Sequence, residues 1–210
     1  MTHPLRTRAA LRLVTAAAIL LALGILMAEG DRLFRLAAGY PIGDELLYVA
    51  SARGDLDGVR QAIREGASPN ALSPTGVPAL AIAASAGESA VVAFLLESGA
   101  DASMRFDGLT ALSYAACTTC DPESIRLLLE AGADPNVARP SPPLVTAASK
   151  GSVEVVQLLL HFGADPERRG TGENKWSPLE AALASNHAEV AALIRRARVR
   201  SSGPSRSFPA

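Results

Sequence analysis

The sequence predicts an all-α solenoid of about five helix-turn-helix repeats, preceded by a hydrophobic transmembrane or signal helix. Three observations predict this fold class. A glycine-containing phrase recurs at a nearly constant spacing, an apolar run precedes every copy of it, and 49% of the chain is hydrophobic although only 4% is aromatic. Because small and aliphatic side chains suit closely spaced helices, the composition favours stacked helices over a β-sandwich.

Four similar phrases mark the ends of the predicted repeats. They occupy residues 66–70 (GASPN), 99–103 (GADAS), 132–136 (GADPN) and 163–167 (GADPE), so their glycines are 33, 33 and 31 residues apart. Apolar runs precede the phrases at residues 59–63, 91–96, 125–129 and 155–160, and alanine pairs lie further upstream at residues 83–84, 115–116 and 147–148. Each repeat is therefore expected to run as helix, turn, helix and loop.

Elementary physical chemistry explains why these residue types recur. A glycine can take the left-handed conformation that ends a helix, and the Asp or Asn after it can hydrogen-bond the local backbone and begin a turn. Proline at the first position of a helix, as expected at Pro143 and Pro178, removes an N–H group that would have no helical partner. The alanine pairs let helices approach closely, and the apolar runs bury a face that one repeat cannot cover alone, so the repeats must stack.

The repeating unit resembles the ankyrin repeat, whose pattern T-P-L-H-x-A-A, then G-H, then L-L-L-x-x-G-A-D-x-N it follows over residues 44–197. The most similar copy contains residues 110–116 (TALSYAA) and 127–136 (LLLEAGADPN). The predicted repeats occupy residues 44–73, 76–106, 108–139, 141–172 and 175–197. The first lacks the Thr-Pro opening and the last lacks a closing G-A-D phrase, as expected of capping repeats. The resemblance implies a monomeric module that binds another protein through a concave surface, with no cofactor.

A hydrophobic segment precedes the repeats. Residues 13–28 (LVTAAAILLALGILMA) carry no charge, and they are too apolar on every face for a helix of a soluble core. Residues 9–28 form an anchor of about 20 residues if Arg12 reaches the headgroups, whereas residues 1–30 are a signal peptide if the chain is cleaved at Ala28-Glu29-Gly30. In both cases the arginine-rich end stays in the cytoplasm. The linker (31–43) and the repeats are then expected in a bacterial periplasm, either anchored to the inner membrane or soluble after cleavage.

The third repeat holds both cysteines of the chain, in a turn one residue longer than those of its neighbours. Cys117 and Cys120 stand three residues apart, and in an exported protein such a pair is expected to form a small structural disulfide. A zinc site is not indicated, because His3, His161 and His187 have no spacing relation to the pair. A thiol–disulfide redox function is the alternative, although a redox pair would stand between a strand and a helix.

The tips of the connectors between repeats carry the candidate partner contacts. These are Arg105, Phe106, Arg139, Arg168, Lys175 and Trp176. The resemblance implies that such connectors touch partners, and the connector that ends at Trp176 is the longest. A tryptophan flanked by basic residues is typical of an interface anchor. The alternative is that Trp176 covers the core of the last repeat as a lid.

Charge is segregated along the chain, although its net value is only −1. Residues 1–28 and 195–210 carry arginines and no acid, whereas the stretch between them carries 12 basic and 21 acidic residues. An acidic scaffold suits a basic partner and opposes nucleic-acid binding. Residues 198–210 are expected to form a disordered basic tail.

No set of catalytic, cofactor-binding or metal-ligating residues is visible in the sequence. It contains no Ser/His/Asp arrangement, phosphate-binding glycine loop or paired acid site. We therefore expect a protein–protein interaction module, either a scaffold or an inhibitor, that acts outside the cytoplasm and is not an enzyme.

Overall fold

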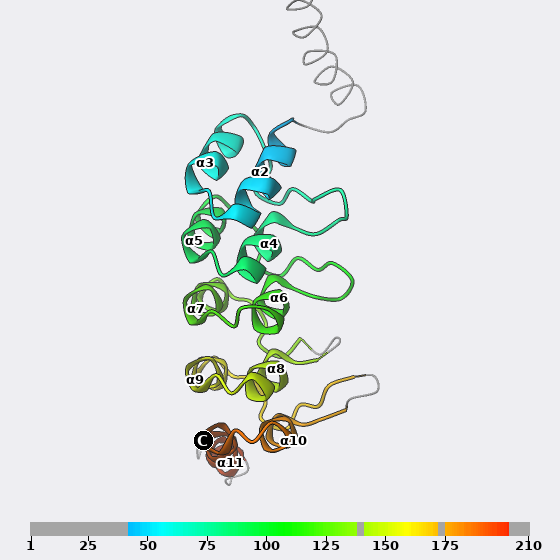
Figure 1. Cartoon of the computed structure of the whole chain (residues 1–210), viewed down its shortest axis with the longest axis vertical. Coiled ribbons are helices and arrows are strands. Elements are labelled where there is room, and N and C mark those ends of the chain that lie inside the picture. The colour runs from blue at the N-terminus through cyan, green and yellow to red at the C-terminus, as the bar shows by residue number, and fades with distance from the viewer. Residues whose placement is uncertain (1–41, 138–140, 172–174, 202–210) are drawn as a thin grey trace, which may run out of the picture. The chain divides into compact units, whose positions relative to one another are not determined.

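The computed structural model describes residues 42–137, 141–171 and 175–201, and those residues form ten helices in five consecutive pairs. The first helices of the pairs are α2 (Ile42–Arg53), α4 (Ala79–Ala86), α6 (Ala111–Cys117), α8 (Pro143–Lys150) and α10 (Pro178–Ala184). The second helices are α3 (Leu56–Arg64), α5 (Ser89–Glu97), α7 (Pro122–Glu130), α9 (Val153–His161) and α11 (Ala188–Ser201). Figure 1 shows the two sets as two stacked columns, with the connectors projecting beside the first set. We call the first set the inner helices and the second set the outer helices.

Glycines and prolines set the helix ends as the sequence predicts. The glycines that open the four phrases have φ between 86° and 93°, a left-handed conformation that would strain any other residue. Pro143 and Pro178 are the first residues of α8 and α10. Helix α10 also begins with a capping box between Ser177 and Glu180, which pairs two backbone N–H groups that the helix itself cannot satisfy.

The core lies between the columns and between successive pairs. The alanine pairs at residues 83–84, 115–116 and 147–148 are fully buried where successive inner helices meet. Larger aliphatic side chains fill the outer column, and they include Val91, Leu95, Ile125, Leu128, Val155, Leu159 and Ile194. This division confirms the expected roles of the small pairs and the apolar runs, since the alanines allow close approach and the larger side chains supply buried apolar area.

The phrases hold neighbouring repeats together. Asp101, Asp134 and Asp165 each accept a hydrogen bond of 2.8 Å from the backbone N–H two residues later, which confirms the predicted local turns. The last residue of a phrase acts on the next repeat. Asn136 donates from Nδ2 to the carbonyl of Gly163 (3.0 Å) and accepts from the N–H of Asp165 (2.8 Å).

Asn70 makes the same pair of bonds to the carbonyl of Gly99 (3.3 Å) and the N–H of Asp101 (2.8 Å). We call this two-bond contact the asparagine clamp. Ser103 and Glu167 take the corresponding positions in the other two phrases. Ser103 bonds within its own turn, to the Asp101 carboxylate, and Glu167 forms an ion pair with Arg198 of α11.

Two sequence predictions concern the ends of the stack. Helix α11 continues to Ser201, so residues 198–201 are helical and the predicted disordered tail (198–210) begins too early. The pairing of Arg198 with Glu167, and arginines in the last turn that favour the helix dipole, extend the helix. The predicted hydrophobic segment (9–28) lies outside the described residues. Among the described residues, no helix has the length and apolarity needed to cross a membrane.

Candidate binding surface

Four connectors project beside the inner helices, and we call them fingers: finger 1 (71–77), finger 2 (104–109), finger 3 (137–142) and finger 4 (168–176), the last two described in part. Finger 2 closes with a tight two-residue turn. Phe106 and Leu109 exchange two backbone hydrogen bonds of 2.9 Å, and Asp107 and Gly108 between them have φ of 51° and 80°. Both positive φ values are typical of the primed hairpin turns, which match the natural twist of a short ribbon.

Phe106 stacks finger 2 on finger 1. A Cβ added at Gly76 of finger 1 would lie 2.7 Å from a carbon of the Phe106 ring, so the ring packs directly against the glycine backbone. Phe106 is consequently half-buried between the two fingers. Arg105, the other predicted partner contact on finger 2, is exposed. Arg139, the candidate on finger 3, lies outside the described residues.

Finger 2 also lies close to the inner column. Burial of the phenol raises the pKa of Tyr114 on α6, and the nearby Asp107 carboxylate contributes to the same shift. Asp107 of finger 2 therefore lies near Tyr114 of α6, in keeping with the position of the fingers beside the inner helices in Figure 1.

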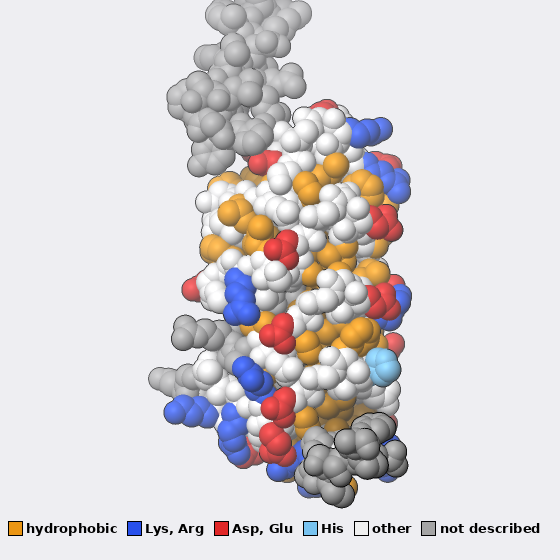
Figure 2. Space-filling view, turned by 180° about the vertical axis from the view of Figure 1, so that it is seen from behind, with side chains coloured by type: hydrophobic (Ala, Val, Ile, Leu, Met, Phe, Trp, Pro, Cys, Tyr) orange, Lys and Arg blue, Asp and Glu red, His pale blue; other side chains and the backbone are white. Residues whose placement is uncertain are grey.

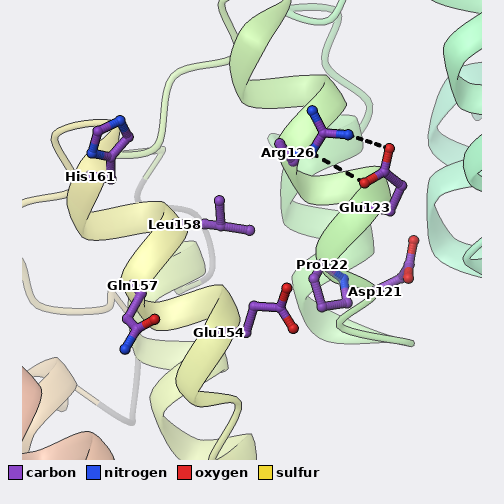
Figure 3. A pocket seen from close by; sticks show the side chains of 8 residues that line it. All are labelled: Asp121, Pro122, Glu123, Arg126, Glu154, Gln157, Leu158 and His161. Atoms are coloured by element: carbon purple, nitrogen blue, oxygen red, sulfur yellow. Dashed lines mark hydrogen bonds and ion pairs between the residues drawn. The ribbon is translucent and has the colours of Figure 1, made fainter.

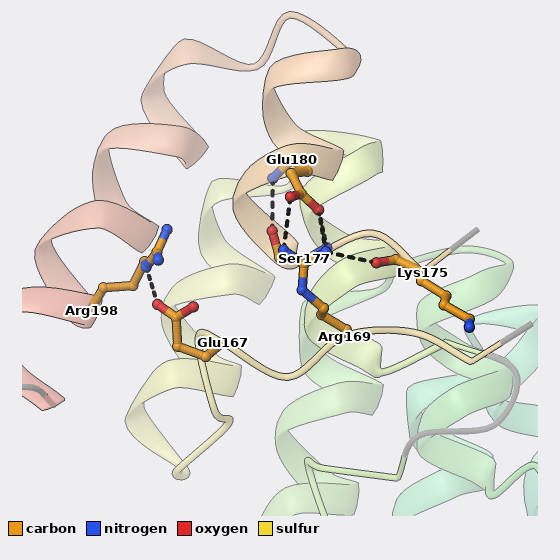
Figure 4. A network of polar contacts seen from close by, with 6 residues as sticks. All are labelled: Glu167, Arg169, Lys175, Ser177, Glu180 and Arg198. Carbon is orange, nitrogen blue, oxygen red and sulfur yellow. Dashed lines mark hydrogen bonds and ion pairs between the residues drawn. The ribbon is translucent and has the colours of Figure 1, made fainter. Parts of the chain in front are cut away.

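Finger 4 is held in place by a polar network that the sequence did not reveal (Figure 4). The Arg169 guanidinium binds both carboxylate oxygens of Glu180, at 3.0 and 2.9 Å, and donates to the carbonyl of Lys175 at 3.0 Å. The backbone N–H of Gly170 donates to the carbonyl of Trp176 at 3.1 Å. One arginine therefore holds both arms of the finger, the residues around Gly170 and those around Lys175, against the start of α10.

Glu180 serves this network and the capping box together. Its carboxylate accepts a hydrogen bond of 2.8 Å from the N–H of Ser177. This backbone bond, followed by the bond from Arg169, lowers the pKa of Glu180. The S-x-x-E capping signal was visible in the sequence, but its pairing with Arg169, eleven residues earlier, depends on the tertiary fold.

The network presents three candidate contacts to solvent. Arg168 and Lys175 are exposed, and Trp176 keeps 43% of its surface exposed. Leu72 of finger 1 is likewise 52% exposed. A tryptophan held by a pinned backbone, with basic neighbours, has the features of an interface anchor.

Charge is divided between the two columns. Among the described residues, the inner helices and fingers carry six basic and four acidic side chains, whereas the outer helices and adjoining turns carry seven basic and 14 acidic ones. Figure 2 shows Lys and Arg side chains over the fingers of the later repeats, beside a row of Asp and Glu side chains. Most of the described acidic side chains therefore lie on the outer helices and on the turns that join them to the fingers.

The cysteine turn of the third repeat bulges as predicted. Cys120 is buried and has φ of 55°, an uncommon conformation for a residue with a side chain, at the position directly before the helix cap where Gly87 and Gly151 stand in the neighbouring repeats. Cys117 is exposed at the end of α6, and both thiols are free in the structure, so the disulfide stays a prediction. Burial raises the pKa of the Cys120 thiol, against smaller opposing effects of Lys150 and Ser152. Across the described residues, no three His, Cys, Asp or Glu side chains are grouped to hold a metal ion.

The outer column carries a shallow pocket of about 410 Å³ between α7 and α9 (Figure 3). Three of its charged groups already stabilise helix α7. Arg126 pairs with Glu123 and Glu130, and Asp121 caps α7 by accepting from the N–H of Ser124 at 2.8 Å. The arrangement offers no nucleophile with a positioned base and is best explained as a solvated helix surface.

The five stacked helix pairs with projecting fingers define a helical repeat protein. Comparison with family models identifies the kind of repeat. A family model described as ankyrin repeats (3 copies) matches residues 46–139, and one described as ankyrin repeats (many copies) matches residues 144–194. The two matches reach from the first helix pair to the last. The chain belongs to the ankyrin-repeat family, whose repeats typically bind other proteins.

Several known proteins are similar to this chain. The B-cell lymphoma 3 protein homolog of Mus musculus is 37% identical over 117 residues, which are 52% of this chain and 26% of that protein. A putative ankyrin repeat-containing protein of Treponema pallidum is 29% identical over 134 residues (62% and 45%). The tyrosine-protein kinase HTK16 of Hydra vulgaris is 33% identical over 130 residues (58% and 17%). The chain thus spans less than half the length of these curated relatives.

Proposed function

We propose that this chain is a protein-binding module, a scaffold or an inhibitor, and that its partner docks on the inner helices and fingers with Trp176 as the main anchor. The observation that carries the proposal is the Arg169 network, which holds finger 4 on α10 while Trp176 remains 43% exposed. A preordered tryptophan loses little conformational freedom on binding. Most of the free energy gained by burying its ring therefore contributes to affinity.

The charge distribution describes the partner. The total acidity of the repeats predicts a basic partner, but most of the described acidic side chains lie on the outer helices and adjoining turns and not on the fingers themselves. On the described part of the fingers, Arg105, Arg168 and Lys175 are exposed, and the acid present is Asp107. The docking surface therefore favours a partner with acidic groups around an apolar pocket for the indole, because complementary charges speed encounter and disfavour wrong partners.

The module works outside the cytoplasm in this proposal, held at the membrane by residues 9–28 or released after cleavage. The support is the arginine-flanked apolar segment in the sequence, which directs export of the residues that come after it. A fusion of alkaline phosphatase after the last residue of the chain, expressed in a bacterium, is expected to be active because this enzyme needs the oxidising periplasm. An inactive phosphatase fusion, together with a fluorescent cytoplasmic fusion of the same chain, would contradict export.

Binding explains the structure better than catalysis does. The thiol–disulfide alternative requires a reactive thiolate, whereas burial raises the pKa of Cys120 and keeps its thiol protonated. In the pocket of the outer column, Arg126 is paired with Glu123 and Glu130, and Asp121 caps α7. We therefore propose that the chain is not an enzyme.

Site-specific photocrosslinking tests the docking surface directly. A benzophenone amino acid replaces Trp176 in the full-length chain, and a matched chain carries it at Ala90, which is exposed on the outer helix α5. The proposal predicts a discrete crosslinked product with one host protein from position 176 and none from position 90. Equal products from both positions, or none from position 176, would contradict it.

A further inference from the structure

The terminal helix α11 is longer than every other outer helix. It has 14 residues, whereas α3, α5, α7 and α9 have nine each. Its residues Arg196, Ala197 and Arg200 line a groove of about 580 Å³ on the outer column, together with residues of α9 and of the 163–167 phrase. The groove is lined by Gln157, Leu160, His161, Ala164, Pro166, Leu193, Arg196, Ala197 and Arg200.

The groove combines an apolar floor with a cationic rim. Leu160 and Leu193 are partly buried and pack on the core, so they offer aliphatic surface at its base. Arg196 and Arg200 lie one helical turn apart on α11, and His161 faces them from α9. None of the groove's lining residues is acidic.

The two arginines differ from the arginine between them. Arg198 forms an ion pair with Glu167 and so fixes α11 against the preceding repeat. Among the described residues, no ion pair involves Arg196 or Arg200. Two guanidinium groups that project over apolar surface, without acidic neighbours in the groove, favour a ligand that brings its own carboxylates.

We propose that this groove is a second binding site, separate from the fingers, and that it takes an acidic peptide segment which places an apolar side chain on the Leu160–Leu193 floor. A peptide fits better than a lipid surface. A flat anionic bilayer attracts every exposed arginine of the helix, including Arg195, whereas the groove selects Arg196 and Arg200. The inference does not depend on the proposed function, because the fingers contribute none of the lining residues.

The test uses the purified full-length chain and a fluorescently labelled eight-residue peptide of alternating Glu and Leu. Peptides in which Gln or Lys replaces Glu serve as chemical controls. Fluorescence anisotropy at low salt is expected to detect binding of the Glu–Leu peptide, and the signal should weaken as salt screens the charges. In NMR spectra, the ring protons of His161 should shift when this peptide is added.

Matched variants locate the site. The double variant R196Q/R200Q is expected to lose about tenfold or more in affinity, equivalent to about 1.4 kcal/mol, because it removes both carboxylate partners. The control R195Q changes an exposed arginine of the same helix that does not line the groove, and it should bind like the unchanged chain. Glutamine preserves helix propensity, so α11 should remain folded in both.

Several outcomes would overturn the proposal. No binding of the Glu–Leu peptide would contradict a binding site in the groove. Equal loss of affinity in R195Q and R196Q/R200Q would indicate unspecific attraction of the peptide to the helix. Loss of peptide binding in W176A with full binding in R196Q/R200Q would assign the peptide to the fingers. Binding that appears only after deletion of residues 203–210 would identify that segment of the chain itself as the occupant.

Discussion

The asparagine clamp should contribute measurably to stability where the third phrase (132–136) meets the fourth (163–167). Asn136→Ala removes two hydrogen bonds between repeats, of 3.0 and 2.8 Å. A protein hydrogen bond contributes a net ~0.5–1.5 kcal/mol, and at this exposed site water can replace the lost partners, so we expect a total loss of about 1–2 kcal/mol. For a chain of this size, that loss lowers Tm by about 2–8 °C.

The opposite change provides a sharper test, because the second phrase lacks a clamp. Ser103→Asn places the same side chain where Gly132 and Asp134 of the next phrase offer the equivalent carbonyl and N–H, and a gain of about 1 kcal/mol is expected. Urea unfolding of the full-length chain, followed by far-UV circular dichroism, measures both variants. Ser103→Ala is the control, since it loses only the bond from Oγ to the Asp101 carboxylate within its own turn and should change stability by less than about 0.5 kcal/mol. Equal stabilities of Asn136→Ala and Ser103→Ala would refute the clamp.

Three further perturbations have defined outcomes. Ser124→Ala should leave the unfolding midpoint unchanged or raise stability by up to about 1 kcal/mol, because the buried hydroxyl has no hydrogen-bond partner; a loss above that size would contradict this. Because the folded pKa of Glu180 is lowered, its stabilising effect is full above its ordinary value near 4.5 and is lost as pH falls through the folded value. Arg169→Gln should flatten that acid dependence in urea titrations, and an unchanged profile would disprove the linkage. In reduced protein, maleimide should label exposed Cys117 at least about tenfold faster than buried Cys120, and equal rates would show that the turn opens readily.

The sequence predicted the stack because its signals are local and repeated. The phrase glycines, the helix-opening prolines and the alanine pairs each act within a few residues, and all of them lie where the periodicity placed them. The fingers were expected at the loops between repeats, and Arg105, Arg168 and Lys175 are exposed there.

The features that the sequence did not reveal depend on contacts between distant residues. Phe106 was expected at a partner surface, but it packs on Gly76 of the neighbouring finger. The arginine-rich end lacks an apolar stripe, so the sequence did not predict that α11 continues to Ser201. The ion pair between Arg198 and Glu167, which supports these helical turns, joins residues far apart in the sequence. Arg169 was overlooked for the same reason, because its partner Glu180 stands on another element.

The most direct test of the account is the effect of Trp176→Ala on binding of the protein captured by crosslinking at that position. Isothermal titration of the full-length chain should show affinity weakened by about 2 kcal/mol or more, as expected for an interface anchor. The variant should remain folded, with a urea midpoint lowered by less than the loss of affinity, because 43% of the residue is exposed and Arg169 holds the finger without the indole. A lowered midpoint with unchanged affinity would contradict the account and would make Trp176 a lid on the last repeat.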